Sequence, residues 1–315
     1  MPDFLELTEN QSRQYIDAQA LVRAQGQALD DVAQVRGSMI WRELRGVRYL
    51  IRTSAASAQK TIGPDNADTQ GIYARFMERK HSATARVKSL TTRLEEQRKL
   101  NRLYGVGRAP NVIVKVLNAL QKAGIAGQFL TVGTNAIYAY ESACGVRVGN
   151  EATATRDMDL LFDTRQRAAF VSTLHRLDTS LLTVLRKADP SFRVLRDQLQ
   201  TAVNDDGYEV DIIRRTAKDG DPHPLRMSQS EDDLWAVQVS SGEKMVASRK
   251  FQQLVVAASG QMALMQTLHP LDFIRIKTHL ASNPQRDPLK RPKDKLQAQV
   301  VQQLWDSYLQ HREAS

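Results

Sequence analysis

The chain has 315 residues, of which 42% are hydrophobic and 25% charged, an ordinary balance for a folded protein with one large core or two modest ones. Its single cysteine, Cys144, excludes an internal disulfide framework and a zinc site built from several cysteines. There is no window of about 18 apolar residues and no visible signal peptide, so we expect a cytoplasmic protein that makes no membrane contact. The net charge of +9 favours a polyanionic partner.

Residues 1–110 are predicted to form a largely helical region with one β-hairpin. Apolar residues recur at helical spacing over 9–35, and Gly26 could kink or break that helix. Segments 39–44 and 47–52 flank Arg45-Gly46, a pattern typical of a strand, a turn and a strand. Residues 54–66 are predicted to be a loop because they end in Gly-Pro-Asp-Asn.

A strongly basic segment, 74–108, follows this loop. It contains ten Lys or Arg against three Glu, a net charge of +7, and its spacing predicts one long helix or two consecutive ones that end near Leu103. A basic stripe on a helix is the footprint of a polyanion, and RNA is the partner we expect there. A solvated helix face would explain the same run of charge.

Helices and strands alternate from Asn111 onward, which predicts an α+β domain over 111–315. This domain would contain a small mixed sheet flanked by helices, with a helix at the carboxyl end. The helices expected are 111–123, 134–144 (capped by Thr134), 165–177, 269–282 and 294–311; the strands are 128–132, 157–162, 198–203, 208–214, 251–257 and 262–267; and 146–155 and 284–293 are loops.

Three aspartates stand on two of these strands. Asp157 and Asp159 are two residues apart and therefore point to the same face, and Asp211 alternates with apolar neighbours in the later strand. Carboxylates about 4 Å apart repel by roughly 4 kcal/mol at an effective dielectric constant of 20, so a cluster of three needs cations. Oxygen ligands select Mg²⁺ or Mn²⁺. Glu209 lies on the same strand face and could replace or assist Asp211.

Gly133-Thr134 precedes the second of the predicted helices. A glycine lets backbone amides approach a phosphate, and the start of a helix offers unpaired N–H groups to an anion. The Thr134 hydroxyl could donate a hydrogen bond to a terminal phosphate oxygen. Two metal ions and a triphosphate are what phosphoryl-transfer chemistry requires, so the ordered combination predicts a nucleoside triphosphate site.

The residues that carry these motifs also resemble a known family. They are similar to a bacterial branch of minimal nucleotidyltransferase-fold proteins in the polymerase-beta superfamily, and the similarity covers most of the chain. The stretches concerned are 129–136, 155–161, 207–213, 269–277 and 286–294 with Gln297, together with Tyr49-Leu50 and the loop through Lys60 and Gly63.

The resemblance implies the nucleotidyltransferase fold, with Gly133 and Thr134 on the triphosphate and the three aspartates as catalytic metal ligands. It also implies that Lys277 and Lys293 lie near phosphate and that Asp294 orients a basic partner, although an ordinary ion pair on a helix surface would explain these three residues equally well. The broader superfamily has Gly-Ser and a carboxylate pair about a dozen residues later. Here Thr replaces Ser and the gap from Gly133 to Asp157 is 24 residues.

The sequence therefore predicts a metal-dependent enzyme that transfers a nucleoside monophosphate from an NTP to a hydroxyl of RNA, such as tRNA. A protein or small-molecule acceptor stays open, as do the preferred NTP and the oligomeric state. One alternative is a nucleotide- or RNA-binding module without turnover, which would not need three clustered carboxylates. Another is a glycosyltransferase with a metal on Asp157 and Asp159, which would leave Gly133-Thr134 and Asp211 without a role.

Overall fold

The computed structural model describes residues 4–54, 58–218 and 220–313. The chain forms two compact units: residues 13–100, called the inserted unit here, and residues up to Ser12 together with those from Asn101 onward, called the main unit. Within the described ranges, no helix combines the length and the hydropathy needed to cross a bilayer.

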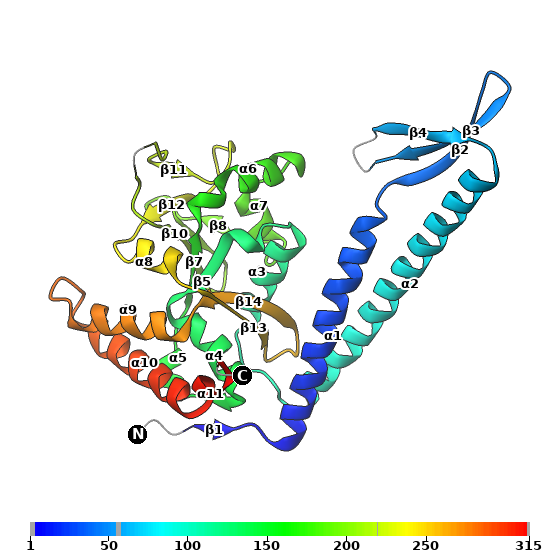
Figure 1. Cartoon of the computed structure of the whole chain (residues 1–315). Coiled ribbons are helices and arrows are strands. Elements are labelled where there is room, and N and C mark those ends of the chain that lie inside the picture. The colour runs from blue at the N-terminus through cyan, green and yellow to red at the C-terminus, as the bar shows by residue number, and fades with distance from the viewer. Residues whose placement is uncertain (1–3, 55–57, 219, 314–315) are drawn as a thin grey trace. The chain divides into compact units, whose positions relative to one another are not determined.

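The inserted unit consists of most of two long helices and a three-stranded antiparallel sheet (Figure 1). The helices are α1 (Glu9–Gln34) and α2 (Ala67–Leu103), and the strands are β2 (Ser38–Leu44), β3 (Val47–Thr53) and β4 (Gln59–Pro64). Helix α1 runs through Gly26 without a break, and the predicted hairpin turn is confirmed, with φ of 53° at Arg45 and 76° at Gly46.

Two expectations for this region need correction. Segment 54–66 is not all loop, because Gln59–Pro64 pairs with β3. The stabilisation from strand pairing outweighs the turn preference of Gly63-Pro64 at the end of this strand. The basic residues of 74–108 do not share one face. At 100° per residue, Lys88 lies on the opposite side of α2 from Arg86, which reaches Asp31 of α1 at 3.4 Å. Arg108 lies outside the helix.

The main unit is built on a seven-stranded mixed sheet. Strand β7 (Asp157–Phe162) pairs in parallel with β10 (Glu209–Arg214), the middle strand of the path β11-β12-β10-β7-β5, and antiparallel with β5 (Phe129–Val132). The predicted hairpin between 198–203 and 208–214 is confirmed as β9 (Thr201–Val203) against β10. The remaining strands are β8 (Arg193–Val194), β11 (Leu225–Arg226) and β12 (Trp235–Gln238).

Alternation along β7 and β10 sends apolar side chains to both faces of the sheet. On one face, Met158, Leu160 and Phe162 pack in the largest hydrophobic cluster, to which α3 (Asn111–Lys122), α6 (Arg167–Arg176) and α7 (Leu181–Arg186) also contribute. On the other face, Leu161 and Ile213 pack with α8 (Gly242–Ala247) and α9 (Pro270–Ser282). On this second face the helices bury Leu161 and Ile213, whereas the aspartates at the amino-terminal ends of β7 and β10 are half-buried.

The remaining elements enclose this end of the sheet. Strands β13 (Lys250–Val256) and β14 (Met262–Leu268) form the predicted hairpin, and α9 lies beside α10 (Arg291–Leu304), which continues through a π-helical turn at Trp305–Leu309 into α11 (Gln310–Glu313) (Figure 1). Helix α10 begins three residues before the prediction because Pro292 fits the first helical turn. Segment 146–155 is not all loop: β6 (Val146–Arg147) pairs with β1 (Leu5–Glu6), and α5 covers Asn150–Thr153.

Candidate functional site

The structure brings the three predicted aspartates to one edge of the main sheet. In the parallel register of β7 and β10, Asp159 lies directly opposite Asp211, and Asp157 lies opposite Glu209. Neighbouring strands are about 4.8 Å apart, so Asp159 and Asp211 are adjacent carboxylates on one face. Asp211, and not Glu209, is the residue beside Asp159.

Negative charge at this edge is poorly balanced. Burial, followed by the carboxylates of Asp157 and Asp211, raises the pKa of Asp159 to about 7, while the ammonium groups of Lys277 and Lys290 act in the opposite direction. Burial and the Asp157 carboxylate also raise the pKa of Asp211, against a hydrogen bond that lowers it. The sequence did not predict a role for Lys290, because it is one of several cations in a polar loop.

Neighbouring hydroxyl and amide groups fix the aspartates. Thr155 donates to Asp157 Oδ1, and Thr201 donates to Asp211 Oδ1. Asn135 Nδ2 donates to the main-chain oxygen of Asp157 at 2.6 Å, which ties the turn after β5 to the start of β7.

The donor set fits a hard divalent cation. It consists of carboxylate oxygens that repel one another, and a bound cation would remove the penalty that raises the pKa of Asp159. In the part of the chain that the structure describes, no three His, Cys, Asp or Glu side chains are already arranged to ligate an ion.

Gly133 follows β5 and lies against Asp159. Its φ is +68°, and a Cβ atom at this position would be 2.3 Å from Asp159 Oδ2. The last residue of β5, Val132, pairs with Asp159 across the strands, which explains this close approach. Only glycine meets both requirements without strain.

Thr134 does not cap a helix, so that prediction was wrong. Residues Gly133–Ala136 form a 3₁₀ turn without a side-chain cap, and α4 (Ile137–Cys144) begins only after it. The Thr134 hydroxyl instead accepts a hydrogen bond from Gln297 Nε2 at 3.0 Å. The turn, and not the end of a long helix, presents the backbone amides on this side of the aspartates.

Gln297 is a site residue to which the sequence assigned no role. It is completely buried on α10, and Nε2 also donates to the carbonyl of Ala152 at 2.9 Å. Its Oε1 and the Oδ1 of Asn135 are buried and lack a hydrogen-bond partner within the described part of the chain. The sequence could have pointed to Gln297, because it is a polar residue on the apolar side of the last predicted helix.

Lys277 belongs to a buried ion network on α9 and α10. Its Nζ lies 2.7 Å from Asp294 Oδ1, and Arg286 Nε lies 3.0 Å from Asp294 Oδ2. Burial lowers the pKa of Lys277, while Asp294 and Asp159 favour its charged form. The surface ion pair considered from the sequence is therefore ruled out for Lys277 and Asp294, which are 8% and 3% exposed.

Lys293 lies elsewhere on α10. Its Nζ donates to the carbonyl of Ala154 at 2.7 Å, at an exposed position just before β7. It therefore lies beside the segment that leads into Asp157.

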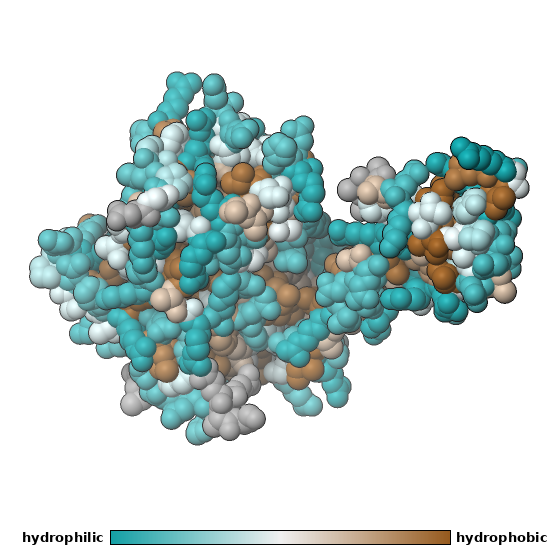
Figure 2. Space-filling view, turned by 45° about the horizontal axis from the view of Figure 1, so that its top comes forward, coloured by the Kyte–Doolittle hydropathy of each residue, from teal (hydrophilic) through white to brown (hydrophobic). Residues whose placement is uncertain are grey.

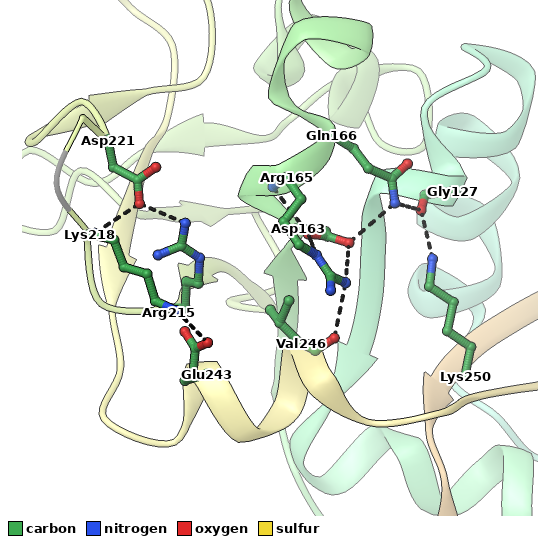
Figure 3. Close-up of polar contacts among 10 residues, drawn as sticks. All are labelled: Gly127, Asp163, Arg165, Gln166, Arg215, Lys218, Asp221, Glu243, Val246 and Lys250. Atoms are coloured by element: carbon green, nitrogen blue, oxygen red, sulfur yellow. Dashed lines mark hydrogen bonds and ion pairs between the residues drawn. The ribbon is translucent and has the colours of Figure 1, made fainter.

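The opposite edge of the sheet also carries many charges, but there Arg165, Arg215 and Lys218 each have a carboxylate partner (Figure 3). Asp163, which follows β7, binds Arg165 at 2.8 Å, and Lys218 binds Glu243 at 2.8 Å. A hydrogen bond from Arg165 to the carbonyl of Val246 at 3.0 Å attaches this group to α8. These pairs neutralise their own charges, which distinguishes them from the aspartates at the other edge.

Comparison with known families assigns this mixed α/β unit, with its acidic edge beside a glycine turn, to the transferases. A family model described as nucleotidyltransferase matches residues 111–315. The chain therefore belongs to this nucleotidyltransferase family. Comparison with curated proteins and with solved structures gave no match.

Proposed function

We propose that the protein transfers a nucleoside monophosphate from an NTP to an acceptor hydroxyl and releases pyrophosphate, on the nucleotidyltransferase fold of the polymerase-beta superfamily. The observation that carries the proposal is the juxtaposition of Asp159 and Asp211 on adjacent parallel strands, with the Gly133 turn against Asp159. Two carboxylate-bearing strands and a glycine turn provide, respectively, ligands for cations and amides for phosphate oxygens.

In the reaction, the acceptor oxygen bonds to the α-phosphorus and gives up its proton to water, and the bond from that phosphorus to the bridging oxygen breaks. The electron pair of the broken bond leaves with pyrophosphate. Two Mg²⁺ or Mn²⁺ ions would supply positive charge at the attacking and leaving oxygens. Asp157 and Asp159 would bind both ions, and Asp211 would bind the one on the acceptor side.

The remaining site residues would act on the triphosphate. The Gly133–Ala136 turn offers backbone N–H groups, and Gln297 fixes the Thr134 hydroxyl beside them. Lys277 is held by Asp294 and interacts with Asp159, so its ammonium group would lie close to a phosphate bound beside the metal ligands. Lys293 would act from the segment before β7.

We propose RNA as the acceptor, with the basic segment 74–108 as part of its binding surface. The test is incubation of the protein with each α-labelled NTP, Mg²⁺ or Mn²⁺ and total cellular RNA. Label should enter RNA with the wild type and with Asp232→Asn, an exposed control, but not with Asp159→Asn or Asp211→Asn. Label on protein would instead identify a protein acceptor, and transfer that survives loss of both aspartates would refute the assignment of the site.

A further inference from the structure

Most of the net positive charge of this protein lies in the inserted unit. Residues 13–100 contain 16 Lys or Arg and 9 Asp or Glu, a net charge of +7 out of the +9 of the whole chain. The main unit, although more than twice as long, is close to neutral. A polyanionic partner would therefore be attracted chiefly to the inserted unit.

Few of these cations are neutralised within the unit. Among its described residues the ion pairs are Arg48 with Asp65 at 3.6 Å, Arg86 with Asp31 at 3.4 Å, and Arg98 with Glu95 at 3.4 Å. All three involve an arginine that is at least two-fifths exposed, and exposed pairs of this kind contribute little to stability. The charge is available to a partner.

The sheet of the inserted unit uses one face for packing on α2. Trp41 packs against Tyr73 with ring centroids 5.8 Å apart, and Arg48 lies over the Trp41 ring at 5.0 Å. Arg52 lies over Phe76 at 4.2 Å. Because Trp41 and Arg52 face the helix, alternation sends the intervening residues of β2 and β3 to the outer face.

This outer face combines apolar, aromatic and cationic side chains. The pairing of β2 with β3 places Ile40, Arg42 and Leu44 beside Val47 and Tyr49. Ile40, Leu44 and Val47 are 38%, 46% and 44% exposed. Figure 2 shows hydrophobic side chains gathered on this unit, at the right of the view, with hydrophilic ones around them.

We propose that this outer face, with Arg42, Tyr49 and the turn residue Arg45, binds single-stranded RNA. The inference deepens the proposed function, since it rests on RNA being the acceptor and assigns the surface that holds it. Arginines would contact phosphates, and Tyr49 with its apolar neighbours would contact bases. A duplex hides its base faces, so an apolar and aromatic surface favours unpaired strands. A second copy of the chain is disfavoured, because two units of charge +7 repel.

The test measures binding separately from catalysis. A fluorescently labelled single strand of RNA, alone or annealed to its complement, is titrated with the full chain by fluorescence anisotropy, without NTP or divalent metal. The single strand is expected to bind more tightly than the duplex. The affinity should fall steeply between about 50 and 200 mM salt.

Two classes of variant separate the phosphate contacts from the base contacts. Arg42→Gln with Arg45→Asn should make the slope of log K against log salt shallower by about 1.4, at about 0.7 for each lost phosphate contact. Asn suits the positive φ of residue 45. Tyr49→Val should weaken single-strand binding by about 5- to 150-fold and leave the slope unchanged. Lys122→Gln with Arg176→Gln removes two exposed cations from the main unit and should change neither quantity.

Circular dichroism and thermal melting of each variant establish that the sheet is folded. Equal or tighter binding of the duplex, or sheet variants that bind like the wild type, would overturn the proposal. Absence of RNA binding, with nucleotidyl transfer to another acceptor retained, would overturn it and leave the transfer reaction standing. Specific single-strand binding without any transfer would support this surface and count against the proposed function.

Discussion

The contact between Gly133 and Asp159 gives a quantitative test of the site. In Gly133→Ala, the new Cβ would lie 2.3 Å from Asp159 Oδ2, whereas real Cβ atoms stay at least 3.0 Å from such neighbours. The carboxylate must therefore retreat by about 0.7 Å. Alanine at a φ of +68° costs about a further 1 kcal/mol.

We expect Gly133→Ala to lower the free energy of unfolding by about 1–3 kcal/mol and kcat/KM for NTP by about 100-fold, because a displacement approaching 1 Å in a reacting group has an effect of that size. Gly145→Ala is a matched control: its φ is +72°, and nothing lies within 4 Å of its Cβ position. This control should lose about 1 kcal/mol of stability and no activity.

The assays are denaturant unfolding and steady-state transfer kinetics on both variants. In an Asp159→Ala background the clashing oxygens are absent, so Gly133→Ala should destabilise no more than Gly145→Ala does. Full activity in Gly133→Ala, or an additional stability loss that persists without the Asp159 carboxylate, would refute the reasoning.

Three further predictions concern buried polar groups. Because the pKa of Asp159 is raised to about 7, this carboxyl group should cost the metal-free protein up to about 4 kcal/mol of stability as pH rises from about 4 to about 7. In denaturant titrations the wild type should therefore lose stability over this range relative to Asp159→Asn, and parallel profiles of the two proteins would contradict the prediction. Gln297→Leu leaves the buried carbonyl of Ala152 without its hydrogen-bond donor, so it should lower the free energy of unfolding by about 2 kcal/mol. It also removes the hydrogen bond that fixes the Thr134 hydroxyl, so it should raise KM for NTP. An unchanged KM would show that Gln297 does not act on the site. Arg214 is completely buried, and its Nε and Nη1 lack partners within the described chain. Arg214→Met should therefore raise the free energy of unfolding by about 1 kcal/mol, and with it the melting temperature. Marked destabilisation would contradict this and indicate that a counter-ion binds Arg214.

Local sequence signals predicted the elements that carry the site. The strand over 157–162 and the strand ending at Arg214 follow from alternating apolar residues, and the structure places both as expected. That Asp211 lies opposite Asp159, and Asp157 opposite Glu209, could not be predicted. Strand register is set by packing across the sheet, which no single segment contains.

The missed features share this dependence on distant parts of the chain. Strand β4 exists because β3 offers it a pairing edge, and β6 exists because residues 5–6 pair with it. Thr134 resembles a helix cap locally, but a glutamine 163 residues later takes its hydroxyl. The sequence of 74–108 predicted the net positive charge and the helix. It did not predict how that charge is distributed around α2, because the segment alone does not specify which side of the helix packs on α1.

The most direct test of nucleotidyl transfer is a parallel reaction with α-labelled and γ-labelled NTP, the acceptor and Mg²⁺. The account predicts that the α-label becomes covalently attached to the acceptor and that the γ-label is recovered as pyrophosphate, in equal amounts. Both should be lost in Asp211→Asn. Transfer of the γ-label to the acceptor, or release of γ-labelled phosphate without attachment of the α-label, would contradict the account.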